Sequence, residues 1–189
     1  MAIYYIYPIY TFSLIIIAYA LVPRVEIRRL IFFGIIFGTV FDISIIVLGS
    51  KILEIFNYIN YGPFECMGIP FFPPIAWAAY FIIFLYHLPE EKPWNYLFVF
   101  TAAGYSTLFS NVLRNLGLFQ WNYGTLIIPF LIYFSWHLTI TWVYYKLTSG
   151  MENNVLGITN SLFEKEKAKN LFKKRGYAIL RLSFRSKLR

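Results

Sequence analysis

The sequence predicts an all-α integral membrane protein, a bundle of five transmembrane helices. The chain is 59% hydrophobic and 22% aromatic but only 14% charged, whereas about 25% of the residues of a soluble domain are charged. Its apolar residues form five long runs, and about 20 apolar helical residues cross the roughly 30 Å hydrocarbon core of a bilayer. The third observation is that basic residues gather on one side of these runs.

The expected spans follow the apolar runs, which end at Pro, Gly or charged residues. They cover residues 3–22, 30–48, 74–88, 94–113 and 125–145. Residues 23–29 are expected to form a basic loop. Residues 51–60 are expected to form a short interfacial helix, because their apolar side chains recur at helical spacing.

The positive-inside rule predicts the N-terminus outside and the C-terminus inside. On that assignment the inner segments carry almost all of the basic residues, namely Arg24, Arg28, Arg29, Lys92, Lys146 and the ten Lys and Arg of the C-terminal tail. The outer connectors carry only Lys51 and Arg114. The protein is therefore expected in the cell membrane as a multi-pass protein.

Two parts are expected, a transmembrane helical domain over 1–149 and a basic cytoplasmic tail over 150–189. The tail has ten Lys and Arg against three Glu, and anionic headgroups attract such a segment. Membrane lipids are thus the expected partners. Nucleic acid is not expected, because no recognition motif accompanies the basic run.

The stretch "YGPFECMGIPFFPPIAW", residues 61–77, contains four prolines and two glycines among large apolar residues. Unpaired backbone groups cannot face lipid at depth, so the stretch is expected outside as a broken segment. Pro74 fits the first turn of the next helix, where a missing N–H costs little. One interpretation is a loop anchored by its aromatic residues, and the other is a re-entrant lid that carries Glu65.

Asp42 is the most informative residue, because it lies in the outer half of the span 30–48. An intramembrane carboxylate is costly and nearly always faces the interior of the bundle, where it marks a functional site. The alternative is a structural polar contact between helices. Gly34 and Gly38 lie on the same face, and small residues let a neighbouring helix approach. That helix belongs to this chain or to a second copy in a homo-oligomer.

Polar residues near the outer side are candidates for one outward-facing pocket, with Arg114 as a partner for Asp42. The expected ligand-binding residues are Asp42, Glu65, Asn111, Arg114, Trp121, Asn122 and His137. Asp42, Glu65 and His137 are also the candidate catalytic residues, although the interface belt and a hydrogen-bonded helix contact explain the aromatic connector and His137 equally simply.

No metal site or cofactor is expected, because the single Cys66 and the two histidines lack ligand spacing. Hydrolase signatures such as G-x-S-x-G and H-E-x-x-H are absent from the sequence.

Two stretches, "YGPFECMGIPFFPPIAWAAY" and "LRNLGLFQWNYGTLIIPFLIYFSWHL", resemble a group of short multi-spanning membrane proteins of Gram-positive, often spore-forming, bacteria. The resemblance covers roughly residues 25–147. It implies about five spans and a lipid setting, and it implies no reaction.

A weaker local likeness is to the membrane carotenoid hydratases, which carry a Tyr-Gly-Pro-aromatic segment, a Gly-x-Pro and a later Trp. The similar positions are Tyr61, Gly62, Pro63, Phe64, Gly68, Pro70 and Trp77. The likeness implies addition of water to a polyprenyl double bond, with Asp42 or Glu65 as the acid.

The leading functional hypothesis is a membrane protein without catalytic activity that binds a lipid-like or small ligand, or a membrane partner. The alternative is an enzyme on an isoprenoid or carotenoid-type substrate. An ion or solute pathway is a third class, for which one central acid and one histidine make a short relay.

Overall fold

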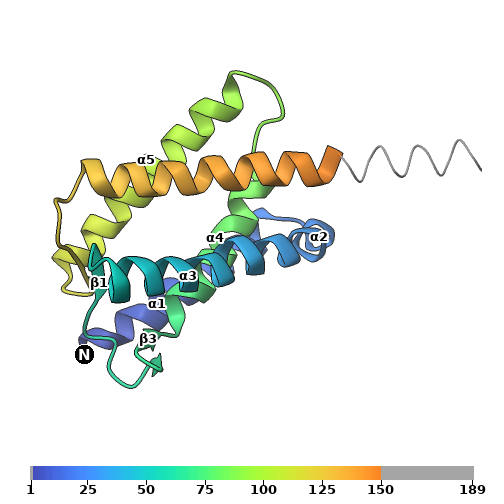
Figure 1. Cartoon of the computed structure of the whole chain (residues 1–189). Coiled ribbons are helices and arrows are strands. Elements are labelled where there is room, and N and C mark those ends of the chain that lie inside the picture. The colour runs from blue at the N-terminus through green and yellow to red at the C-terminus, as the bar shows by residue number, and fades with distance from the viewer. Residues whose placement is uncertain (1, 150–189) are drawn as a thin grey trace, which may run out of the picture. The chain divides into compact units, whose positions relative to one another are not determined.

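The computed structural model describes residues 2–149, and the predicted tail lies outside them. Helices dominate the described part, and Figure 1 shows their arrangement. Their bounds are η1 Ile3–Tyr5, α1 Ile6–Leu21, α2 Arg24–Gly34, η2 Ile35–Val40, α3 Phe41–Ile46, η3 Val47–Ile52, α4 Phe72–His87 and α5 Trp94–Asn115, with a last helix over Ile127–Ser149. The strands are β1 Phe56–Tyr58, β2 Glu65–Cys66, β3 Ile69–Pro70 and β4 Phe119–Trp121. Met1–Trp142 form one compact unit, within which the site described below lies.

The second span is one continuous helix, Arg24–Ile52, that includes the expected loop 23–29. That expectation is wrong, because Pro23 precedes the first turn and its carbonyl accepts a hydrogen bond from the Ile27 N–H at 2.9 Å. The charged residues extend the helix past the apolar run, with Glu26 and Arg29 paired at 3.2 Å. At 29 residues, the helix is about 44 Å long and exceeds the hydrocarbon core.

Two turns of this helix, η2 and η3, are π-helical, and α3 lies between them. π turns are rare and lie frequently at functional sites. Asp42 is the second residue of α3, so the intramembrane carboxylate follows a π turn directly.

The predicted interfacial helix over 51–60 is also wrong. The helix ends at Ile52, and β1 then pairs antiparallel with β4 of the connector between α5 and the last helix. Phe56 stacks on Phe119 with ring centroids 5.2 Å apart. Aromatic residues favour paired strands, and this partner lies too far along the chain for local spacing to reveal it.

The stretch 61–77 is broken, as predicted, and it forms a β-hairpin before α4. Strands β2 and β3 pair across Met67 and Gly68, whose φ angles are +54° and +72°. Positive φ at both central residues is the geometry of a type I′ hairpin turn. Helix α4 begins at Phe72, so that Pro73 and Pro74 occupy its first turn, where a missing N–H costs little.

Gly34 and Gly38 face α4 of the same chain. A Cβ on Gly34 would lie 2.7 Å from Ile82 Cγ1, and a Cβ on Gly38 would lie 2.4 Å from the Ala78 nitrogen. The helix predicted to approach these glycines is therefore α4 (Figure 1). A homo-oligomer would have to use another surface.

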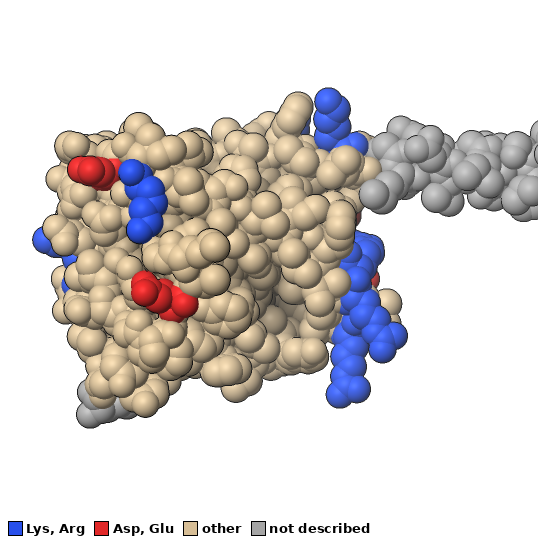
Figure 2. All heavy atoms as spheres, turned by 60° about the horizontal axis from the view of Figure 1, so that its bottom comes forward, with Lys and Arg blue, Asp and Glu red and all other residues tan. Residues whose placement is uncertain are grey.

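Four of the described helices are long and apolar enough to cross a membrane, namely Ile3–Leu21, Arg24–Ile52, Trp94–Asn115 and Ile127–Ser149. Helix α4 is apolar but has 16 residues, or about 24 Å. Large apolar side chains cover the outside, among them Ile16 and Ile127 at 68% and 72% exposed. The face in Figure 2 shows a broad band without charged residues between charged groups at two ends, as expected of a membrane-embedded protein.

Candidate functional site

The Asp42 carboxylate is buried inside the helix bundle. Its residue is 3% exposed, and its Oδ2 atom accepts no hydrogen bond within the described part of the chain. Buried polar groups are nearly always paired, so an unpaired carboxylate oxygen needs an explanation. The cavity beside it supplies one.

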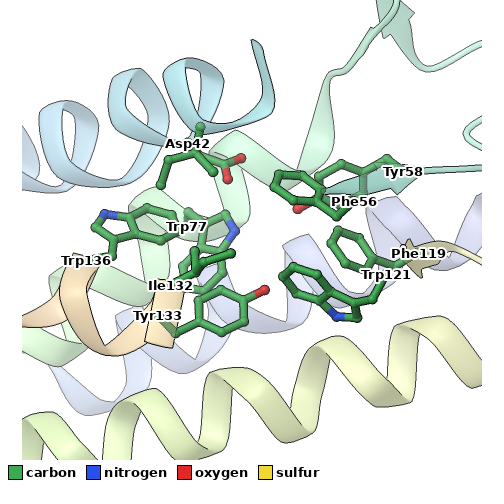
Figure 3. Close-up of a pocket in the computed structure, with 10 residues that line it drawn as sticks. Asp42, Phe56, Tyr58, Trp77, Phe119, Trp121, Ile132, Tyr133 and Trp136 are labelled. Carbon is green, nitrogen blue, oxygen red and sulfur yellow. The ribbon is translucent and has the colours of Figure 1, made fainter. Parts of the chain in front are cut away.

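Asp42 faces a small cavity with a mainly aromatic lining, called the Asp42 pocket here. The lining residues are Asp42, Ile45, Phe56, Tyr58, Trp77, Phe119, Trp121, Ile132, Tyr133 and Trp136. Figure 3 shows the Asp42 carboxylate and the Tyr133 hydroxyl turned toward the space between the rings. The cavity volume open to the centre of a water-sized sphere is about 10 Å³, which is room for about one water molecule.

The connectors over 53–71 and 116–126 supply one wall of the pocket through the β1–β4 pair. In this pair Phe56 lies opposite Trp121 and Tyr58 lies opposite Phe119. Alternate residues of a strand point to the same side, so both aromatic residues of each strand line the pocket while the residue between them does not. Two polypeptide segments distant in sequence thereby form one aromatic ribbon.

All three tryptophans form hydrogen bonds through their indole N–H groups, that of Trp77 with the Tyr58 hydroxyl oxygen. Trp136 Nε1 donates to the Phe37 carbonyl oxygen in η2 at 3.3 Å, and Trp121 Nε1 donates to Ser110 Oγ at 3.2 Å. Trp77 packs on Trp136 with ring centroids 4.6 Å apart. The rings are thus held in place, with their faces and edges forming the lining (Figure 3).

Three tyrosines, Tyr10, Tyr58 and Tyr133, lie close enough to Asp42 to interact with its charge. Tyr58 comes from the connector outside the spans. Removal of its hydroxyl from water raises the pKa of Tyr58 well above its ordinary value, and the charge of Asp42 raises this pKa further. The Tyr58 hydroxyl therefore stays protonated at physiological pH and presents both a donor and an acceptor.

His137 is 0% exposed and is not itself among the residues that line the pocket, although it contacts the lining residues Tyr133 and Trp136. Its Nδ1 is 2.7 Å from the Tyr133 carbonyl oxygen, and its Nε2 is 2.9 Å from the Tyr80 hydroxyl. A carbonyl can only accept, so Nδ1 carries the proton and Nε2 accepts from Tyr80. Both ring nitrogens have partners, as in the hydrogen-bonded helix contact that is the alternative interpretation of this residue.

The other predicted ligand-binding residues are distributed as follows. Trp121 lines the pocket with Asp42, whereas Glu65, Asn111, Arg114, Asn122 and His137 are not among its lining residues. Glu65 and Arg114 are exposed, and the expected Asp42–Arg114 pair is not formed.

Asn111 and Asn122 fix the connectors by hydrogen bonds from their side-chain amides to backbone carbonyls. Asn111 Nδ2 donates to the Thr125 carbonyl oxygen at 2.7 Å, and Asn122 Nδ2 donates to the Glu54 carbonyl oxygen at 2.6 Å. In the structure these two side chains bind backbone.

Sequence reasoning missed most of the aromatic lining, because aromatic residues occur in every apolar run. One signal was available: both connectors contain an aromatic-polar-aromatic triplet, "FNY" at 56–58 and "FQW" at 119–121. Alternation with period two indicates a strand with one aromatic face. Two such triplets predict a paired ribbon better than an interfacial helix.

Across residues 2–149, no three His, Cys, Asp or Glu side chains come together as a metal site would require. The arrangement instead offers one buried carboxylate, tyrosine hydroxyls and aromatic rings around a small cavity. No protein family, curated protein or solved structure matches this chain.

Proposed function

We propose that this protein is a multi-pass membrane protein that binds a small ligand, or one polar group of a lipid-like ligand, in the Asp42 pocket. The observation that carries the proposal is the buried Asp42 carboxyl group, which faces an aromatic cavity and whose Oδ2 accepts no hydrogen bond from residues 2–149. Concave, mostly apolar sites with a few convergent polar groups are typical of ligand binding.

We propose further that α4 is the fifth crossing and that the N-terminus lies outside the cell. Residues near the N-terminus contact both outer connectors: the Tyr7 hydroxyl is 2.7 Å from the Ile59 carbonyl oxygen and 2.6 Å from the Leu118 carbonyl oxygen. These segments can meet on one side of a membrane only if an even number of spans separates the N-terminus from each connector, two before the first connector and four before the second. This supports a crossing by α4, with flanking residues making up for its short length.

The orientation rests on charge. With Arg24, Arg28, Arg29 and Lys92 inside, the positive-inside rule is satisfied. The pocket then opens toward the outer half of the cell membrane, and the basic tail is cytoplasmic, where anionic lipids attract it.

Binding is favoured over catalysis by the size of the pocket. Room for about one water molecule suits one polar group of a ligand and leaves no space for a polyprenyl chain. Apart from tyrosine hydroxyls, Asp42 is the one proton-transferring side chain among the lining residues.

The alternative is an enzyme on an isoprenoid or carotenoid-type substrate, similar to the membrane carotenoid hydratases. One observation favours it: a carboxyl group stands among aromatic rings, whose faces stabilise positive charge such as that of a protonated alkene. This reading requires the β1–β4 ribbon to move so that a chain can enter.

Mass spectrometry of small molecules and lipids that copurify with the full-length protein tests the binding proposal. We expect a bound species that is depleted at least tenfold in Asp42→Asn and retained in Glu90→Gln, an exposed carboxylate in the connector between α4 and α5. Equal retention in both variants would contradict it. Hydration of a polyprenyl substrate by wild type, lost in Asp42→Asn, would establish the alternative.

A further inference from the structure

We infer that the group held in the Asp42 pocket is a primary ammonium, –NH3⁺, at the end of a free amine or of a lipid headgroup. The inference rests on the proposed binding function and names the chemical class of its ligand. Charge, ring chemistry, available acceptors and size each support it independently.

The Asp42 carboxyl group has no cationic partner in the lining of the pocket. None of the residues that line it is Lys, Arg or His. Lys51 lies beside the Gly68 hairpin, where its Nζ would be 3.1 Å from a Cβ built on Gly68, and Arg114 is exposed. An ionised carboxyl group inside a membrane protein calls for an opposite charge, and the described residues do not supply one at the site.

The aromatic lining suits a cation. Lys-like ammonium groups are attracted to the faces of Trp and Tyr rings, with Trp the strongest. Trp77, Trp121 and Trp136 line the pocket. An anionic group would meet both Asp42 and the negative ring faces, so phosphate and carboxylate ligands are disfavoured.

The hydrogen-bond acceptors of the pocket also match the donors of a primary ammonium. A primary ammonium has three N–H donors and no acceptor. Asp42 Oδ2 accepts no hydrogen bond from the described residues. The hydroxyl oxygens of Tyr58 and Tyr133 are two more acceptors in the lining, beside their hydrogen bonds with Trp77 and Ser110. The indole N–H groups of Trp121 and Trp136 are already bound to Ser110 and to the Phe37 carbonyl, and that of Trp77 is bound to Tyr58, so none of them competes for the Asp42 acceptor.

Size separates primary from quaternary ammonium. The cavity volume of about 10 Å³ has room for one group of the size of a water molecule. An –NH3⁺ group is of that size, whereas a trimethylammonium group has four heavy atoms and would push the rings apart. Aromatic cages for quaternary ligands thus need more space than this one provides.

Isothermal titration calorimetry of the full-length protein in non-ionic detergent tests the inference with three probes of one chain length. These are n-hexylammonium, hexyltrimethylammonium and hexanol. We expect hexylammonium to bind at least tenfold more tightly than the other two, and Asp42→Asn to weaken it at least tenfold while Glu90→Gln leaves it unchanged. If Asp42→Asn does not stay monodisperse, Trp77→Phe replaces it, with at least a threefold loss expected.

Lipid nanodiscs identify the source of the amine. If a headgroup supplies it, phosphatidylethanolamine will be retained over phosphatidylglycerol by wild type and not by Asp42→Asn. If a free amine supplies it, hexylammonium will bind equally in phosphatidylglycerol nanodiscs and detergent, without lipid selectivity.

Failure of the inference differs from failure of the proposed function. Equal affinity for hexanol or hexyltrimethylammonium, or hexylammonium binding that survives both pocket variants, would overturn the ammonium assignment. A neutral or anionic molecule that copurifies in an Asp42-dependent way would also overturn it, yet would leave a binding function in place. No copurifying species and no response to any probe would overturn both.

Discussion

Gly38 approaches Ala78 so closely that a Cβ on Gly38 would lie 2.4 Å from the Ala78 backbone nitrogen. The obstacle is backbone, so no side-chain rotation can relieve it. We expect Gly38→Ala to lower the free energy of unfolding by about 2 kcal/mol or more, as overpacking does. Thermal unfolding in detergent, followed by tryptophan fluorescence, measures the change.

Gly104 is the matched control, because it lies inside α5 and nothing stands within 4 Å of a Cβ there. Gly104→Ala should be neutral or stabilise the helix by up to about 1 kcal/mol. Similar losses in both variants would mean that α4 does not pack on the glycine face.

The Tyr7 hydroxyl links the start of the chain to the connectors over 53–71 and 116–126, and its residue is 0% exposed. Tyr7→Phe removes the hydroxyl that makes this contact, so we expect the free energy of unfolding to fall by about 1–3 kcal/mol. Tyr19→Phe on the same helix, where Tyr19 is 64% exposed, should change the unfolding temperature little. Hydrogen exchange should also quicken at Ile59, whose N–H donates to the Leu118 carbonyl oxygen.

The features that depend on local composition could be predicted from the sequence. Apolar runs, the proline pair at the start of α4 and an inward-facing Asp42 all follow from the cost of polar groups in lipid. The pocket does not, because its ribbon is made by pairing Phe56–Tyr58 with Phe119–Trp121, a contact between segments more than sixty residues apart. The start of the helix at Arg24 was missed because a prediction from apolar runs ends the helix at the charged stretch 24–29. Charged residues can continue a helix where it leaves the hydrocarbon.

The Tyr80–His137 pair joins α4 to the last helix at 2.9 Å, deep among aromatic rings. Tyr80→Phe and His137→Leu should each destabilise the protein without altering ligand binding to the Asp42 pocket. In a double-mutant cycle we expect a coupling of about 1 kcal/mol, the typical net contribution of one hydrogen bond. A coupling near zero, or loss of ligand binding in Tyr80→Phe, would mean that the pair has a different role.

Asp42 should lower the stability of the ligand-free protein. An uncompensated buried charge is destabilising, and functional sites commonly carry such a cost. We expect Asp42→Asn to raise the unfolding temperature of amine-free protein. Thr141→Val removes another buried, unpaired oxygen, Oγ1, outside the lining residues of the pocket, and should be stabilising by less because no charge is involved. A lower unfolding temperature for Asp42→Asn would show that Asp42 is a structural anchor.

Cys66 offers a direct test of orientation, because it is the only cysteine of the chain and is exposed on β2. With the N-terminus outside, a membrane-impermeant maleimide should label Cys66 in intact cells. In Cys66→Ser combined with Val25→Cys, where Val25 is 76% exposed near the start of α2, labelling should require permeabilised cells. Labelling of the second protein but not the first in intact cells would reverse the orientation. Labelling of both would mean that the helix Arg24–Ile52 does not cross the membrane, because its two ends would then lie on one side.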